Sequence, residues 1–142
     1  MFGVIVVALD GSEAAQRALP IAAELARRDG ARLVIAHVDE AIAAKGGAHL
    51  RADEPDICAA LERQAAELSA RGIDTSLEVV EIRLGGPARA IAEIAAEADA
   101  DLIVVATRGH TPLSGLLVGS VTQRLLHIAH RPVLVVPAAG SG

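Results

Sequence analysis

The sequence is nearly without aromatic residues: among 142 residues there is one phenylalanine, and there is no tyrosine or tryptophan. Proteins that stack single-stranded nucleic acid, or that bind quaternary cations in aromatic cages, need rings that this chain lacks. A net charge of −5 provides no positive field to release counterions from nucleic acid or to attract an acidic membrane. We therefore expect neither a nucleic-acid partner nor a membrane partner.

Cysteine and lysine are scarce as well, since the chain has only Cys58 and Lys45. One cysteine excludes an internal disulfide framework and a cysteine-rich metal site. The apolar runs, such as 4–9 and 102–106, have the length of strands and fall far short of the roughly 18 residues that a membrane span needs. The N-terminus lacks the features of a signal peptide. We expect one domain, residues 1–142, in the cytoplasm.

Short β-branched runs alternate with alanine-rich stretches of helical periodicity. The first run is apolar at almost every position, which predicts a strand buried on both faces, as in a parallel sheet. Pro20 should kink the first helix, because it removes a backbone hydrogen bond. The alternation predicts an α/β domain with helices on both faces of a parallel sheet. The predicted strands are 4–9, 33–38, 75–82, 102–106 and 133–136, and the predicted helices are 13–29, 55–71, 87–98 and one that begins near 120.

The loops that follow the strands are the places to look for a ligand, because open α/β sheets bind ligands beyond the carboxyl ends of their strands. The first strand ends in Asp10-Gly11-Ser12. Gly119-Ser120 stands at the start of the fourth helix, where free N–H groups and the helix dipole favour an anion such as phosphate. By spacing alone, an ordinary turn and helix cap is the commoner interpretation. Residues 39–53 are polar and contain glycine, and we interpret them as a mobile loop long enough for a lid.

Several better-known sites are absent or poorly supported. No G-x-x-x-x-G-K-[ST] or G-x-G-x-x-G motif occurs, which argues against a P-loop NTPase and a standard dinucleotide dehydrogenase. A receiver domain would use Asp10 as phosphate acceptor, but it also needs neighbouring acids and a lysine near the fifth strand. The chain has neither, so this interpretation is disfavoured. His127 and His130 are three residues apart without an acidic or cysteine partner nearby, so we expect no metal site. His37 is expected to be buried or near the ligand crevice, and Cys58 to be a packed thiol.

Four segments carry a more specific signal: VIVVALDGSE, LVIAHV, GGPARAIAEIAAEADADLIVVATRG and SGLLVGSVTQRLLHIAHRPVLVV. They span nearly the whole chain, which resembles the universal stress proteins of the small, single-domain kind. The ATP-binding members of that family have G-x2-G-x9-G-[ST] between the fourth strand and the fourth helix. At these places the chain has Ala106, Gly109, Gly119 and Ser120, so that three of the four positions match and the spacing is intact.

The resemblance implies a fold and a ligand. The fold is a three-layer, doubly wound sheet of five parallel strands in the order 3-2-1-4-5, Rossmann-like and similar to the adenine nucleotide alpha hydrolases. ATP would lie between the first and fourth strands. Asp10 matches the acidic residue on the adenine side, and Val38 matches the residue whose backbone contacts adenine. The residues that match the phosphate cradle are Gly109, Gly119, Ser120 and Val121.

Further expectations concern ions, hydrolysis and assembly. Arg108 and Arg124 are the cations nearest to the cradle, and each either contacts a phosphate or faces solvent. Mg²⁺ or Mn²⁺ would be held through the nucleotide phosphates and water. We expect slow ATP hydrolysis at most, because no general base and no lysine is visibly placed for it. The resemblance implies a homodimer that forms through 133–136, and a short apolar edge strand gives a physical reason to pair.

Ala106 leaves two functions open. If the backbone there needs a positive φ, alanine is strained by roughly 1 kcal/mol or more, which would weaken nucleotide binding. The leading interpretation is an ATP-binding universal stress protein that acts as a nucleotide-dependent signalling or protective module in the stress response. The alternative is a nucleotide-independent interaction protein of the same family, with a vestigial phosphate cradle.

Overall fold

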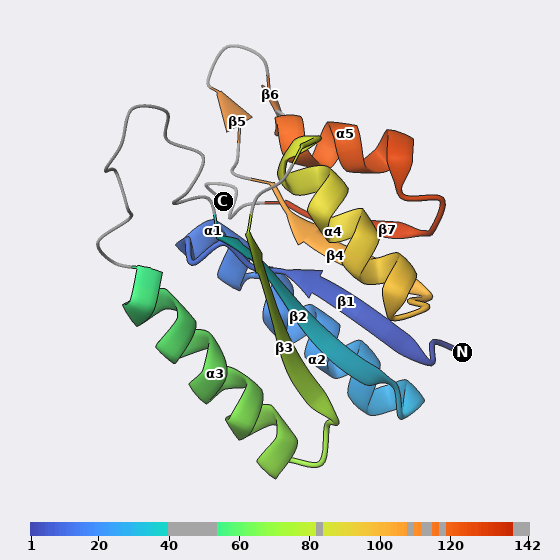
Figure 1. Cartoon of the computed structure of the whole chain (residues 1–142). Coiled ribbons are helices and arrows are strands. Elements are labelled where there is room, and N and C mark those ends of the chain that lie inside the picture. Colours follow the sequence, from blue (N-terminus) through green and yellow to red (C-terminus); the bar gives the residue numbers. More distant parts are fainter. Residues whose placement is uncertain (40–53, 82–83, 108–109, 112–114, 117–118, 138–142) are drawn as a thin grey trace.

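The computed structural model of the chain describes residues 1–39, 54–81, 84–107, 110–111, 115–116 and 119–137. Strands and helices alternate along most of this part of the chain (Figure 1). The strands are β1 (Val4–Ala8), β2 (Arg32–Asp39), β3 (Thr75–Glu81), β4 (Leu102–Ala106), β5 (His110–Thr111), β6 (Gly115–Leu116) and β7 (Val133–Val136). The helices are α1 (Glu13–Gln16), α2 (Ala18–Asp29), α3 (Glu54–Ala70), α4 (Gly86–Glu97) and α5 (Ser120–Ile128).

The central sheet has five parallel strands in the order β3-β2-β1-β4-β7. Because β7 is the last strand of this sheet along the chain, the predicted order 3-2-1-4-5 is confirmed. Ile5 of β1 pairs with Leu33 of β2 on one side and with Leu102 of β4 on the other. The strand order therefore reverses between β1 and β4, and this reversal opens the crevice in which such sheets bind ligands.

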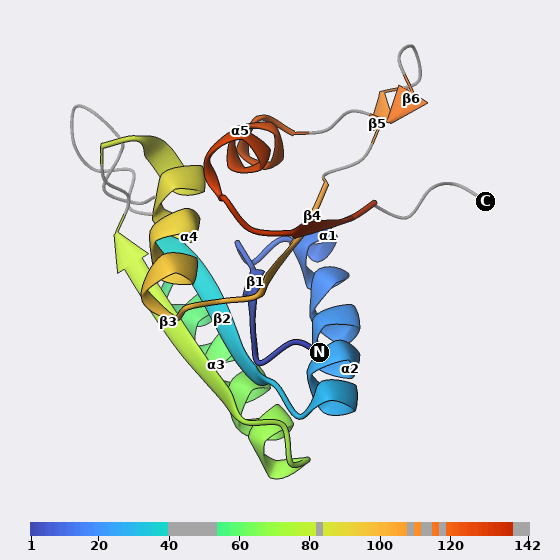
Figure 2. The same ribbon diagram turned by 90° about the vertical axis from the view of Figure 1, so that its right-hand side faces the viewer.

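Helices cover both faces of the sheet (Figure 2). Ile5 and Val7 of β1 point to the face that α2 and α3 cover, whereas Val6 points to the face of α4 and α5. All three side chains are fully buried. The unbroken apolar run at the start of the sequence thus reflects a strand with protein on both sides, as predicted.

The predicted first helix is two helices, which corrects the expectation of one kinked helix. α1 ends at Gln16, and α2 begins at Ala18 after Arg17, whose N–H donates to the carbonyl of Ala14 rather than to a residue four back. Pro20 is consequently the third residue of α2. In the first turn of a helix a missing N–H costs nothing, because that group would have no intrahelical partner.

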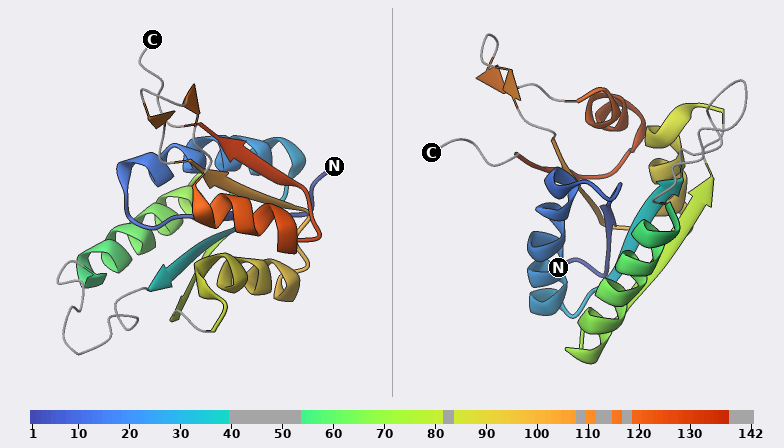
Figure 3. Two further views of the ribbon diagram at one scale, coloured as in Figure 1. Left: turned by 90° about the horizontal axis from the view of Figure 1, so that it is seen from above. Right: turned by 90° about the vertical axis from the view of Figure 1, so that its left-hand side faces the viewer.

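A second correction concerns the loop after β4, in which β5 and β6 form a small antiparallel hairpin. The hairpin projects away from the main sheet (Figure 3). Residues 40–53, most of the predicted mobile loop, lie outside the described residues. None of the helices in the described part of the chain combines the length and apolar character that a membrane span needs.

The amino ends of the strands are tied together by an aspartate. Asp101, just before β4, accepts hydrogen bonds from the N–H groups of Gly3 at 2.7 Å and Val4 at 3.0 Å. These two donors hold the pKa of the Asp101 carboxyl below its ordinary value. The tie lies at the end of the sheet opposite the crevice.

Candidate functional site

A pocket of about 330 Å³ lies where β1 and β4 end and α5 begins. Its walls are made of small and aliphatic side chains, backbone and a few hydroxyl groups. Asp10 is the one ionisable side chain among the described residues that line it. The lining residues are Ala8, Leu9, Asp10, Ser12, Ala15, Ala36, Val38, Pro87, Ile91, Val105, Ala106, Thr107, Gly119, Ser120, Val121 and Thr122.

Asp10 is held by the turn between β1 and α1. Its Oδ1 accepts a hydrogen bond from the N–H of Ser12 at 2.8 Å, and the Ser12 hydroxyl accepts one from the N–H of Ala15 at 3.1 Å, which caps α1. Gly11 is required between them, because its φ is +89° and a Cβ atom there would lie 2.9 Å from the side chain of Ile57. The turn therefore fixes Asp10 at the pocket wall through its close contact with α3.

The beginning of α5 offers free donors to the pocket. Gly119 is the N-cap residue and provides no side-chain hydrogen bond, and Ser120 and Val121 follow as the first helical residues. Gly119 has φ −60°, and a Cβ atom built on it meets no heavy atom within 4 Å. Nothing in the described protein therefore requires glycine there. Its missing side chain leaves open the approach to helix N–H groups that favour an anion.

Ala106 lies in β4 with ordinary strand geometry. It pairs with Val136 of β7, and the non-glycine residues with positive φ in the described chain are Asp99 and His130. Ala106 is half-buried and lines the pocket. The backbone strain that an alanine could have suffered here is absent, so the difference from glycine amounts to one methyl group in the pocket wall.

Val38 lies at the pocket near the end of β2, where it pairs with Val80. The N–H of Leu9 donates to the carbonyl of Ala36 at 2.9 Å, so the polar backbone groups of Ala36 face β1. Alternate residues of a strand face the same neighbour, so the N–H and C=O of Val38 also face that side, beyond the last residue of β1. The strand thus presents backbone polar groups toward the crevice.

Two of the predicted binding residues, Arg108 and Gly109, lie outside the described residues. Arg124 is exposed and lines a hollow of about 380 Å³ that adjoins the pocket along Ser120 and Val121. The structure brings the other predicted residues together at the pocket. Pro87, Ile91 and Thr107 also line the pocket, and sequence reasoning gave them no binding role.

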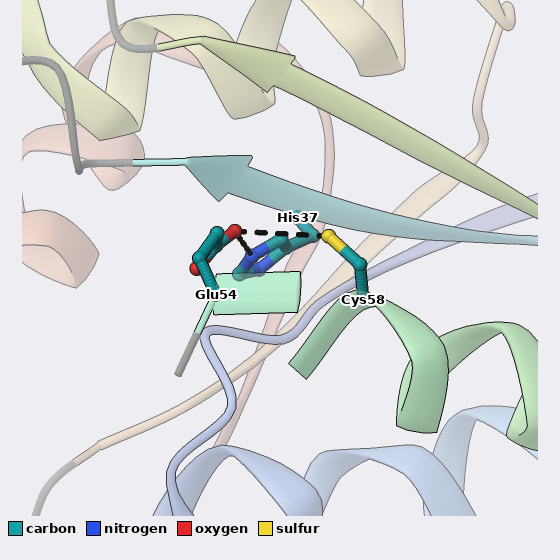
Figure 4. A group of neighbouring side chains, drawn as sticks. All are labelled: His37, Glu54 and Cys58. Carbon is teal, nitrogen blue, oxygen red and sulfur yellow. Dashed lines mark hydrogen bonds and ion pairs between the residues drawn. The ribbon is translucent and has the colours of Figure 1, made fainter. Parts of the chain in front are cut away.

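A second group of chemically active side chains lies on the other face of the sheet (Figure 4). His37 of β2 is fully buried, and its Nδ1 and Nε2 atoms lie 2.8 Å from the carbonyl oxygen of Leu9 and 2.5 Å from Oε1 of Glu54. Cys58, one turn after Glu54 on α3, is half-buried, with Sγ 3.8 Å from the same Oε1. Burial and the Glu54 charge raise the pKa of the Cys58 thiol.

This cluster refines the predictions for His37 and Cys58. His37 is buried as expected, and it supports the end of β1 from behind the pocket. Sequence reasoning did not connect the two residues to Glu54, although Glu54 and Cys58 are four apart on a helix and share a face. His127 and His130 do not share one, because α5 ends at Ile128 and His130 lies beyond it with φ 51°.

Comparisons with known proteins agree on one family. The family model described as the universal stress protein family matches residues 1–137. A universal stress protein of Thermus aquaticus is 35% identical over 96% of this chain and 99% of its own length. The solved structure of a family member from Burkholderia pseudomallei is 31% identical with a TM-score of 0.69, over 96% of both chains. Another universal stress protein, solved in complex with cAMP, is 29% identical with a TM-score of 0.70, over 95% of this chain and 96% of its own. The protein described here therefore belongs to the universal stress protein family.

Proposed function

We propose that the protein is an ATP-binding universal stress protein, a nucleotide-dependent signalling or protective module. The observation that carries the proposal is the pocket at the strand-order reversal, into which the uncapped start of α5 opens. Its volume of about 330 Å³ falls within the usual range of ligand pockets, roughly 300–1,000 Å³.

The phosphate groups would lie against the start of α5. The N–H groups of Ser120 and Val121 and the Ser120 hydroxyl supply donors, and the helix dipole favours negative charge. The open space over Gly119 admits a phosphate oxygen where a side chain would block it. Arg124 stands beside the adjoining hollow, on the route that a triphosphate would follow. Arg108 and Gly109 complete the cradle in this proposal.

The adenine ring would lie at the other end of the pocket, between Asp10 and Val38. Adenine presents an amino donor and ring-nitrogen acceptors, which the Asp10 carboxylate and the Val38 backbone can satisfy. Because the described residues that line the pocket include no aromatic side chain, the ring would contact aliphatic walls such as Ile91. Adenine specificity would therefore come from hydrogen-bond geometry rather than from stacking.

Binding without efficient turnover fits the charges of the pocket. Asp10, its ionisable residue, stands at the proposed adenine end and is held by the Ser12 N–H. No general base among the described lining residues thus faces the phosphates. Mg²⁺ or Mn²⁺ would be held by the phosphates and water, and it would neutralise charge there. The relative solved with cAMP supports an adenine nucleotide as the ligand class.

Calorimetric titration of the protein with ATP, AMP and cAMP tests the proposal, with Gly119→Ala as the central variant. The added methyl group contacts none of the described residues, so the free energy of unfolding should change by less than about 1 kcal/mol. The ATP affinity should fall about tenfold or more, equivalent to ~1.4 kcal/mol. Ser120→Ala should weaken ATP binding with little effect on stability.

Gln123→Ala serves as the matched control, because Gln123 is exposed one turn further along α5 and does not line the pocket. Its ATP affinity should equal that of the unchanged protein. Absence of binding at millimolar ATP, or equal affinities for Gly119→Ala and Gln123→Ala, would reject the ATP site. The nucleotide-independent interaction module with a vestigial cradle would then be preferred.

We also propose that the protein is a homodimer that pairs through β7. β7 is an edge strand with the short apolar sequence of Val133–Val136, and Leu134 leaves 37% of its surface exposed. Unpaired edge strands of this kind favour pairing with a second chain. Sedimentation at micromolar concentration should give twice 14.5 kDa, and Leu134→Glu should give the monomer mass. A monomeric unchanged protein would contradict this assembly.

A further inference from the structure

We propose that His37, Glu54 and Cys58 form a binding site for a divalent transition-metal ion, with Zn²⁺ as its best chemical match. One candidate ligand atom from each residue, a His37 ring nitrogen, a Glu54 carboxylate oxygen and Cys58 Sγ, lies within 4.8 Å of the other two. Figure 4 shows the three side chains pointing toward one another from β2 and α3. The site lies behind the proposed nucleotide pocket and uses none of its lining residues.

The orientation of His37 is that of a metal ligand. A carbonyl oxygen can only accept, so the ring donates its Nδ1–H to Leu9 and leaves Nε2 facing Glu54 and Cys58. Metal-ligating histidines characteristically donate their other ring N–H to a carbonyl or carboxylate, which fixes the ring. The imidazole would therefore need no rotation to bind an ion through Nε2.

Glu54 provides a second, independent observation. Its Oε2 atom has no hydrogen-bond partner among the described residues, and it is also shielded from solvent, because the residue is only 8% exposed. Buried carboxylate oxygens are normally satisfied, and an orphan of this kind calls for an explanation. A cation that the carboxylate binds through both oxygens would compensate the charge and supply the interaction that Oε2 lacks.

The donor set selects the kind of metal. Imidazole, carboxylate and thiolate together suit Zn²⁺, whereas Mg²⁺ and Ca²⁺ require oxygen ligands. Zn²⁺ with a neutral His37, a Glu54 carboxylate and a Cys58 thiolate has no net charge, as a buried site requires. Three protein ligands leave a fourth position for water or another donor.

The distances between the ligand atoms can be compared with those of a tetrahedral zinc site. Zn–ligand lengths of about 2.0–2.3 Å place tetrahedral ligand atoms about 3.3–3.7 Å apart. The Cys58 Sγ to Glu54 Oε1 distance of 3.8 Å is already close to that range, whereas Nε2 to Oε1 at 2.5 Å is short. Zinc binding would take the place of the His37–Glu54 contact and widen the distance between Nε2 and Oε1 by about 1 Å. Glu54 is the first residue of α3, where small side-chain movements disturb no preceding helical turn.

Titration of the full-length, metal-stripped protein with ZnCl₂ against a chromophoric chelator tests the proposal. We expect one equivalent of Zn²⁺ to bind, and MgCl₂ not to compete. CoCl₂ should give the intense visible bands of four-coordinate Co²⁺ together with a sulfur-to-cobalt charge-transfer band. Cys58→Ser should remove the sulfur band and lower the Zn²⁺ affinity at least tenfold, and Glu54→Gln should also lower it about tenfold.

Matched controls separate this site from adventitious binding. Glu62→Gln removes an exposed carboxylate from the same helix, and His127→Ala removes an exposed imidazole from α5, and neither should change the Zn²⁺ affinity. Far-UV circular dichroism checks that Cys58→Ser and Glu54→Gln fold. No binding below millimolar Zn²⁺, a Co²⁺ spectrum without a sulfur band, or equal affinities in all four variants would overturn the proposal. The cluster would then be a buried hydrogen-bonded pair with a packed thiol.

Discussion

The pocket and the His37–Glu54–Cys58 cluster lie on opposite sides of the end of β1, and they are built in different ways. The pocket uses backbone groups, small residues and a helix start, so its lining includes a single ionisable side chain among the described residues. The cluster uses three polar side chains within a few ångströms of one another. A site built from backbone groups can be recognised in the sequence by the spacing of its glycines and helix caps. A site built from side chains on separate elements has no such spacing, because its residues lie far apart in the chain.

The largest effect is expected from His37→Ala. It would leave the Leu9 carbonyl without the imidazole donor and the buried Glu54 carboxylate without its imidazole partner. Breaking a buried pair in this way costs about 3–5 kcal/mol, so chemical denaturation should give a greatly reduced free energy of unfolding. A loss below ~1 kcal/mol would show that the cluster contributes little to the fold.

The next largest effect is expected from Gly11→Ala, which allows a comparison between Gly11, in the turn beside the pocket, and Gly119, in the pocket wall. A positive φ and the approach to Ile57 predict a loss of about 1–3 kcal/mol in the free energy of unfolding. Gly119→Ala, with neither constraint, should behave oppositely, losing ATP affinity and keeping stability. Thermal melts and ATP titrations of both variants check this, and similar melts for the two would contradict it.

Ala106→Gly should have a smaller effect and tests the methyl group in the pocket wall. The strand should lose about 0.5–1 kcal/mol, because glycine has more backbone freedom in the unfolded chain. Since Ala106 is unstrained, we expect the ATP affinity to rise less than about tenfold. A rise of a hundredfold or more would mean that the methyl group obstructs the nucleotide.

Asp101→Asn should have the smallest effect and touches neither region. The folded-state pKa of Asp101 is lowered, so its contribution to stability is present above about pH 3.9, the ordinary aspartate value, and is lost as pH falls through the lowered pKa. The variant should melt slightly earlier at pH 7, and the difference should shrink below pH 3.9. ATP and Zn²⁺ titrations should remain unchanged.

The fold and the location of the pocket could be predicted from the sequence. The apolar run at Ile5–Val7 predicted a strand that is covered on both faces. The spacing from Ala106 to Ser120 indicated the end of a strand and the start of a helix at the pocket. Both signals are local, since they depend on residues close together in the chain. The break between α1 and α2 at Arg17 was not predicted, because a proline at position 20 is compatible both with a kinked helix and with a second helix that begins just before it.

The cluster could not be predicted, because its members are joined only by packing. His37 and Glu54 are 17 residues apart, on a strand and a helix that are held together by core packing, in which Ile35 of β2 and Leu61 of α3 belong to one buried cluster. A sliding window over the sequence has no access to such a contact. Glu54 and Cys58 share a helix face, but a separation of four residues is common among helical residues that form no site.

The backbone of Leu9 connects the pocket to the His37–Glu54–Cys58 cluster. Its N–H binds the Ala36 carbonyl, its carbonyl binds the His37 ring, and the next residue is Asp10. An ion bound through His37 Nε2 would therefore act, through the Leu9 carbonyl, on the residue that precedes Asp10 at the proposed adenine end. By thermodynamic linkage, whatever factor zinc imposes on the dissociation constant of ATP, ATP must impose equally on that of zinc. Measuring each dissociation constant in the presence and absence of the other ligand would complete the thermodynamic cycle. The structural link between the two sites would be one residue, Leu9.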